Sequence, residues 1–152
     1  MGNSLSEFLR ARKEQSSATT VDWNRKRDQW LEAVRGLYLR VENMLRADRE
    51  AGVVEVRTRE VPVTEQFVGT YDAPLLELRV GMDEVQFLPK GVTVVGAEGR
   101  VDLRGDRNTV TLLWEGGDRW TVVLGRVPEL EAASLSEDSL RDALQKVMLP
   151  VL

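Results

Sequence analysis

The sequence predicts an α+β domain: an antiparallel up-and-down meander of six to eight strands, with one apolar face covered by a long N-terminal helix and a short C-terminal helix. Residues 53–125 alternate apolar and polar side chains and are interrupted by Gly, Asp and Asn, which is typical of antiparallel strands joined by turns. Residues 21–51 and 136–149 instead carry apolar side chains at helical spacing. A length of 152 residues fits a single domain, residues 1–152.

Residues 1–20 predict a short helix followed by a hinge. Ser4 and Glu7 have the spacing of a capping box, in which each side chain bonds a backbone N–H at the start of a helix. Residues 16–20 are small and mostly hydroxylated, and such side chains compete with the helix for hydrogen bonds. We therefore expect the short helix to end there.

Residues 21–51 predict one long amphipathic helix that ends at Gly52. The helix would be about 43 Å long, which is more than a sheet of short strands covers. We therefore expect its N-terminal end to protrude or to pair with a second copy, unless the first helix folds back over Trp23 and Trp30. The apolar stripe consists of Trp23, Trp30, Val34, Leu37, Val41, Met44 and Leu45.

One arrangement of turns places the large apolar residues of the meander on a single face. Residues opposite each other across a hairpin share a face, so slipping a turn by one residue breaks this agreement. The first turn sets Leu78 opposite Phe87, and the second sets Phe87 opposite Val94. The turns lie at 81–84, 90–91, 96–99, 106–107 and 116–118. The shared face comprises Leu76, Leu78, Val80, Val85, Phe87, Val92, Val94, Val101, Leu103, Val110, Leu112, Trp114, Trp120, Val122 and Leu124.

The two ends of the meander have weaker signals. Strands are expected at 53–58 and 65–70, with Pro62 and Pro74 marking edges or bends because proline cannot donate to a ladder. After the meander, Ser136 can cap a helix over residues 136–149. The buried stripe of that helix is Leu140, Ala143, Leu144, Val147 and Met148, with a staple between Leu135 and Leu140 and a stop at Pro150.

The composition excludes many kinds of chemistry. The chain has no Cys and no His, which excludes zinc fingers, thiolate clusters and Cys–His or Ser–His–Asp nucleophiles. We predict no catalytic, cofactor-binding or metal-binding residues. The turns 81–84, 96–99 and 116–118 fall at the same end of the predicted meander, and this is the only end where several carboxylates could come together. We expect them to be dispersed there; they are Asp83, Glu84, Glu98, Glu115 and Asp118.

Charge and hydropathy limit the kinds of partner and the cellular location that can be expected. A net charge of −4 argues against a general nucleic-acid binder. No apolar run is long enough to span a membrane, and the N-terminus is charged where a signal peptide is apolar, so we expect a cytoplasmic protein without membrane contact. The excess of Arg over Lys and the absence of Ile indicate a GC-rich, bacterial genome.

The second face of the sheet is the candidate interaction surface. Alternation places Val95, Leu113 and Val123 on it, and the register sets Leu113 opposite Thr121 and Val123 opposite Thr111. A moderately apolar, flat face can bind another protein. With the two helical tryptophans, the candidate surface is Trp23, Trp30, Val95, Leu113 and Val123.

Three functional hypotheses follow. The first is a non-catalytic bacterial protein-interaction module, an adaptor or regulatory subunit, that binds itself or another protein. The second is a carrier for a small apolar ligand, in which the sheet curls toward a barrel. The third and most remote is a carboxylate-based, metal-dependent enzyme. An unfilled hollow inside the sheet would favour the carrier, and a helix lying in it would remove the carrier's cavity.

Overall fold

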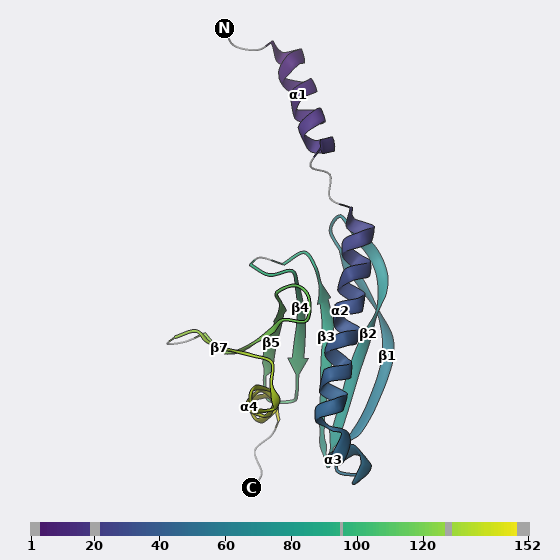
Figure 1. The fold of residues 1–152 in the computed structure, drawn as a ribbon, viewed down its shortest axis with the longest axis vertical. Helices are drawn as coiled ribbons and strands as arrows, with labels where there is room; N and C mark the ends of the chain where they lie inside the picture. The colour runs from purple at the N-terminus through teal and green to yellow at the C-terminus, as the bar shows by residue number, and fades with distance from the viewer. Residues whose placement is uncertain (1–3, 19–21, 95, 127–128, 149–152) are drawn as a thin grey trace.

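The computed structural model describes residues 4–18, 22–94, 96–126 and 129–148, and in it the chain forms one antiparallel sheet with helices against it (Figure 1). The seven strands are ordered β1 to β7 as in the chain, so the predicted meander is confirmed. The strands are β1 (Glu55–Glu65), β2 (Gly69–Val80), β3 (Asp83–Gly91), β4 (Gly99–Arg104), β5 (Thr109–Trp114), β6 (Trp120–Gly125) and β7 (Glu131–Ser134). The helices are α1 (Leu5–Ala18), α2 (Trp23–Met44), α3 (Arg46–Glu50) and α4 (Glu137–Val147).

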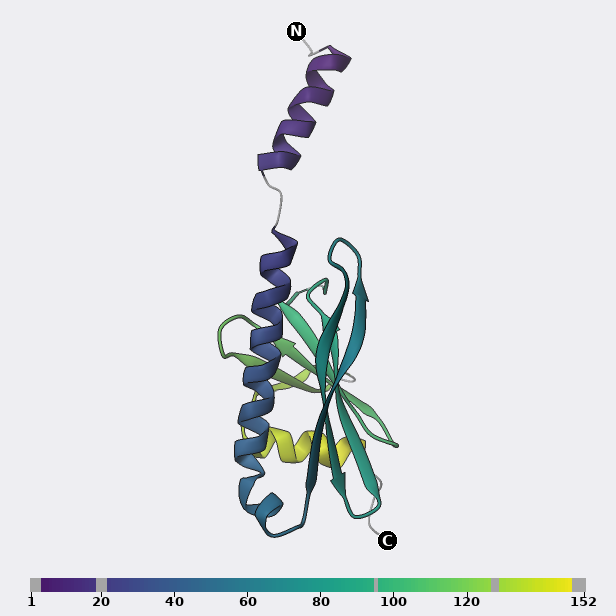
Figure 2. The same ribbon diagram turned by 90° about the vertical axis from the view of Figure 1, so that its right-hand side faces the viewer.

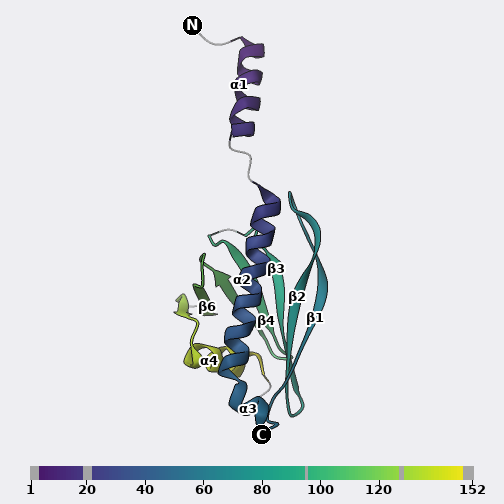
Figure 3. The same ribbon diagram turned by 45° about the vertical axis from the view of Figure 1, so that its right-hand side comes forward.

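Two helices cover the apolar face of the sheet. The long α2 packs on β2 and β3, and α4 packs on β4, β5 and β6 (Figure 3). In Figure 2, α4 runs across the direction of α2. The predicted face is confirmed for the residues that lie in strands: ten are buried, and Val80, Trp114 and Leu124 are partly buried and pack against the core. Val92 also packs against the core but lies in the β3–β4 connection. Val94 is partly buried and lies in a loop.

The helix predicted over residues 21–51 is two helices, and its N-terminal end does not protrude from the sheet. The chain turns at Leu45 (φ −96°, ψ 1°) between α2 and α3. The predicted stop at Gly52 is correct: Gly52 has φ 75°, its N–H bonds Arg49 O, and the next N–H, of Val53, bonds Asp48 O, which is a Schellman motif. The expected overhang is absent because β1 and β2 are 11 and 12 residues long.

Residues 92–94, which the predicted turns at 90–91 and 96–99 would place in a strand, do not form one, and β3 pairs directly with β4. The register sets Phe87 opposite Leu103, where Val94 was expected, and Pro89 opposite Val101, with an irregularity between Pro89 and Gly91. Residues 92–94 lie in the connection, and Val95 lies outside the described residues. The Lys90-Gly91 dipeptide resembles a turn, but Gly91 (φ 123°) belongs to a bulge at the end of β3.

The other predicted pairings differ in accuracy. Leu103 lies opposite Val110 and Trp114 opposite Trp120, as predicted. Leu78 lies opposite Val85, two residues from the predicted partner, because Gly81-Met82 forms a two-residue turn. Such a shift keeps every side chain on its predicted face.

The remaining strands lie at the two edges of the sheet. The predicted segments 53–58 and 65–70 belong to one long hairpin, with β1 at the edge and its turn at 66–68. Pro62 lies in β1, where the edge position accommodates it. At the other edge, β7 was not predicted.

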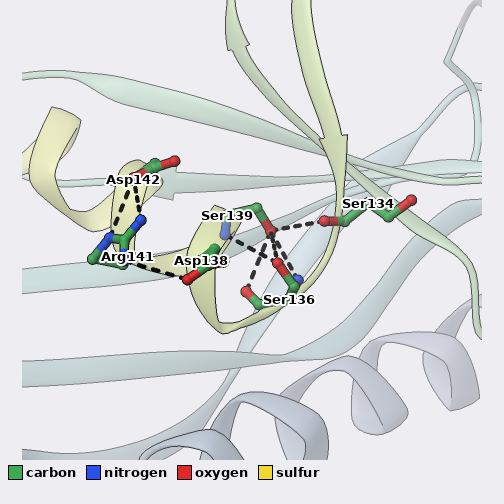
Figure 4. A network of polar contacts seen from close by, with 6 residues as sticks. All are labelled: Ser134, Ser136, Asp138, Ser139, Arg141 and Asp142. Carbon is green, nitrogen blue, oxygen red and sulfur yellow. Dashed lines mark hydrogen bonds and ion pairs between the residues drawn. The ribbon is translucent and has the colours of Figure 1, made fainter.

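The helix caps agree with the sequence. Ser4 accepts a hydrogen bond from the N–H of Glu7, but α1 continues through Ala18, past the start of the predicted hinge, and Thr19 and Thr20 lie outside the described residues. Ser136 caps α4 by accepting from the N–H of Ser139 at 3.1 Å. Figure 4 shows this cap, in which Ser139 Oγ also donates to the carbonyl of Ser134. The predicted stop at Pro150 lies outside the described residues.

Candidate functional site

The interaction surface predicted from the sequence does not form as one surface. Trp30 is fully buried by the chain's own sheet, and Val123 is 7% exposed. Trp23 is partly buried and stacks on Phe67 at the β1–β2 turn, with ring centroids 5.5 Å apart. Leu113 is partly buried, opposite Thr121 as predicted. The argument that the helical tryptophans need a partner chain is therefore wrong for Trp30, which lies beside Trp114 and Trp120. Trp23 is covered in part by the β1–β2 hairpin.

The hollow that a carrier would need is occupied by α2. Trp30, Val34, Leu37 and Val41 are each 0% exposed against the sheet. The hydroxyl of Tyr38 lies 2.8 Å from the carbonyl oxygen of Pro74 and 3.1 Å from that of Phe87, so its single proton serves two strand carbonyls. Burial raises the pKa of Tyr38 far above its ordinary value, and the hydroxyl stays neutral.

A groove of about 560 Å³ opens between α2 and the β5–β6 turn. We call it the α2 groove. On α2 its residues recur at helical spacing and form one stripe beside the core stripe. Gly36 leaves it open, because a Cβ on Gly36 would meet nothing within 4 Å. The α2 residues are Gln29, Glu32, Ala33, Gly36, Leu37 and Arg40, and the opposite wall is Glu98, Trp114, Glu115, Gly116, Gly117, Asp118 and Trp120.

Hydrogen bonds fix the turn that forms the wall of the α2 groove. Arg40 Nη1 donates to the carbonyl of Asp118 at 2.6 Å, which joins α2 to the β5–β6 turn. Within the turn, Trp114 Nε1 donates to the carbonyl of Gly117 at 2.9 Å, and Arg119 donates to the carbonyl of Glu115 at 2.8 Å. The partly buried indole of Trp114 therefore has a fixed position in the groove.

The α2 groove is acidic. Glu32, Glu98, Glu115 and Asp118 line it, and none of the four takes part in an ion pair within the described residues. Arg40 is the single basic side chain in the lining. The carboxylates are too dispersed for a metal: no three acidic side chains in the described part of the chain are grouped so that they can hold an ion.

The prediction that the turn carboxylates share one end of the sheet is wrong in part. Asp83 and Glu84 start β3 and lie at the opposite end of the sheet from Glu98 and Asp118. The reason is that β3 pairs directly with β4, without the expected strand between them. Each strand of a meander reverses the direction of the chain, so with one strand fewer the β2–β3 turn lies at the other end of the sheet from the turns that follow. Sequence reasoning also missed Glu32, which joins the turn carboxylates from α2.

The exposed apolar residues of α1 form a second feature with functional potential. Leu5, Phe8 and Leu9 are 74%, 57% and 55% exposed. With Arg12 they occupy positions i, i+3, i+4 and i+7, so they lie on one side of the helix. In Figure 1, α1 stands apart from the sheet, beyond the N-terminal end of α2.

A buried carboxylate holds the β3–β4 connection against the β1–β2 hairpin. Glu65 accepts hydrogen bonds from the N–H groups of Val92 and Thr93, from the Thr93 hydroxyl and from the Tyr71 hydroxyl. Burial and the bond to Glu65 raise the pKa of Tyr71. A Cβ on Gly91 would lie 2.0 Å from Glu65 Cδ, so glycine is required there. Three of the donors bond Oε1 and the Tyr71 hydroxyl bonds Oε2, so the carboxylate is a structural pin between the two segments.

A smaller, more apolar groove lies at the other end of α2. It has a volume of about 440 Å³ and lies between the α2–α3 junction and α4. Its apolar lining is Met44, Leu45, Val80, Leu140, Leu144 and Met148.

Comparison with protein-family models, with curated proteins and with solved structures finds no match to this chain. Across the described residues, each helix is too short or too polar to traverse a lipid bilayer.

Proposed function

We propose that the protein is a non-catalytic interaction module that associates with itself through α1. The observation that carries this proposal is the apolar patch of α1, in which Leu5, Phe8 and Leu9 are each more than half exposed. Apolar side chains grouped on one side of a helix mark a surface that binds another element.

The length of α1 supports the same proposal. It has 14 residues, and isolated helices shorter than about 12–15 residues are marginal in water without packing. The helix also ends in Ser-Ser-Ala, which has low helix propensity apart from the alanine. Burial of its apolar side against a partner is therefore the expected source of its stability.

The position of α2 favours an interaction module over a carrier. The helix fills the face of the sheet where an apolar ligand would bind, with Trp30 between Trp114 and Trp120 at centroid distances of 6.0 and 5.9 Å. A carrier would have to displace α2 to create a cavity.

Sedimentation equilibrium of the full chain over a wide dilution series tests the proposal. We expect a concentration-dependent oligomer that Phe8→Glu dissociates, because a carboxylate cannot be buried in an apolar contact. The control is Leu39→Glu, which places the same charge at an apolar residue of α2 that is 61% exposed, and we expect it to associate like the wild type. A wild-type chain that stays monomeric at every concentration contradicts the proposal.

A further inference from the structure

We infer that α1 of one copy seats in the α2 groove of a second copy, and that the exchange is reciprocal. This inference rests on the proposed function and names the site that receives α1. Its support comes from the match in spacing, the match in charge and the sequence that connects α1 to α2.

The apolar stripe of α1 and the groove stripe of α2 are complementary in size and spacing. An α1 that lies antiparallel to α2, with Ala18 beside Trp23, sets Leu5 beside Gly36 and Phe8 beside Ala33. In this arrangement the large side chains of Leu5 and Phe8 lie opposite the small residues Gly36 and Ala33. Farther along the two stripes, Leu9 falls beside Glu32 and Arg12 beside Gln29. The space above Gly36 is open and receives Leu5 without a clash.

The charges match as well. Residues 5–18 have three basic side chains, Arg10, Arg12 and Lys13, which are exposed, and two acidic ones, Glu7 and Glu14, so α1 has a net charge of +1. The α2 groove has four carboxylates that are not in ion pairs within the described residues, and its one basic group, Arg40, is engaged with the Asp118 carbonyl. Opposite charges at the rim of an interface favour the correct register over others.

The connecting sequence selects a second copy over the chain's own groove. The residues between α1 and Asp22, which caps α2 by accepting from the N–H of Arg25, are Thr19-Thr20-Val21. All three are β-branched, a residue type that favours extended backbone. The segment has no Gly or Asn, the residues that adopt the positive φ of tight reversals. In the structure α1 stands apart from its own α2 and sheet (Figure 1), which leaves the α2 groove open to α1 of another copy, as in domain exchange.

Cross-linking tests the contact directly, because the chain has no native cysteine. A Phe8→Cys chain is mixed with a tagged Ala33→Cys chain and treated with a short bis-maleimide. We expect the mixed product to exceed several-fold the product with a tagged Leu39→Cys chain, in which the cysteine lies at an exposed position outside the groove lining. Equal yields for the two partners would overturn the inference.

Filling the groove provides the second test. Gly36→Arg places a long cation in open space without disturbing the core, and we expect it to weaken self-association by about thirtyfold, as at a hot spot. Gly36→Ala is the matched control and should associate within about threefold of the wild type, since a methyl group leaves the groove open. Unchanged circular dichroism shows that each variant is folded.

Complementation separates this inference from the proposed function. Phe8→Glu keeps an intact groove and Gly36→Arg keeps an intact α1, so the two monomeric variants should form a mixed dimer through one contact. If Phe8→Glu dissociates the oligomer but Gly36→Arg does not, α1 binds elsewhere and the inference fails while the proposed function stands. A monomer in which Phe8→Cys and Ala33→Cys of one chain cross-link to each other, or an α1 that binds anionic lipid vesicles instead, also overturns it.

Discussion

Gly99 lies against the indole of Trp30 so closely that a Cβ at position 99 would be 2.3 Å from Cζ3 and 2.4 Å from Cε3. The indole is fully buried and has Trp114 and Trp120 on its other sides. The long helix can therefore approach the sheet only because the first residue of β4 has no side chain.

The first prediction is that Gly99→Ala destabilises the protein. The added methyl group must push Trp30 out of its position, and overpacking of this kind costs about 1–3 kcal/mol. Urea unfolding followed by tryptophan fluorescence measures the change. A variant as stable as the wild type would mean that α2 does not approach β4 as closely as 2.3 Å implies.

The second prediction has the opposite sign. Gly36→Ala adds a methyl group in the middle of α2 where nothing lies within 4 Å. Alanine is favoured over glycine in a helix interior by up to about 1 kcal/mol, so the free energy of unfolding should rise by about that amount. The measurement is again urea unfolding, at a protein concentration where the chain is monomeric. A loss of stability would show that position 36 is covered.

The third prediction concerns the carboxylate pin. Glu65→Gln removes the charge that accepts from the N–H groups of Val92 and Thr93, and we expect a loss of about 1–3 kcal/mol. Amide hydrogen exchange should speed up at both N–H groups. Glu60→Gln, at an exposed position of the same strand, is the matched control and should change neither measurement.

The fourth prediction is a loss of stability in alkali. The two tyrosines of the chain, Tyr38 and Tyr71, both have raised pKa values in the folded protein, mainly because burial disfavours the phenolate. The unfolded chain therefore releases these protons first. Stability should be complete below the ordinary tyrosine pKa of about 10 and fall above it, by up to about 1.4 kcal/mol per pH unit for each tyrosine.

The ultraviolet absorbance of tyrosinate provides the measurement. We expect it to appear together with loss of the folded circular dichroism signal, and not before. Tyr38→Phe should reduce the slope of stability against pH above pH 10 by about half, since one of two groups is removed. Titration of both tyrosines in a chain that remains folded would contradict this prediction.

Local sequence was sufficient to predict those elements that are fixed by residues close together in the chain. The pairing of Trp114 with Trp120 follows from a short turn that contains two glycines with positive φ, Gly116 and Gly117. The cap of α4 at Ser136 and the stop at Gly52 are likewise encoded within a few residues. Patterning alone placed the apolar face, because a register error of two residues leaves every side chain on its face.

Features set by distant residues could not be predicted in this way. The segment after Gly91 alternates like a strand, but Glu65, far earlier in the chain, holds its N–H groups in a loop. That error also misplaced Asp83 and Glu84 relative to the other turn carboxylates. The strand β7 had no signal because all four of its residues are exposed and do not alternate. The α2 groove combines a helix with a turn whose approach only the folded chain reveals.

The order of the elements along the chain has a consequence for synthesis. Each strand pairs with the next one in the sequence, so every hairpin can close as soon as its second strand is made. By contrast, α2 is made before any strand, and the residues that enclose Trp30, among them Gly99 and Trp120, come much later. Until those residues are made, Trp30 of the nascent chain lacks the side chains that enclose it, and transiently exposed apolar surface of this kind is the reason that chaperones exist.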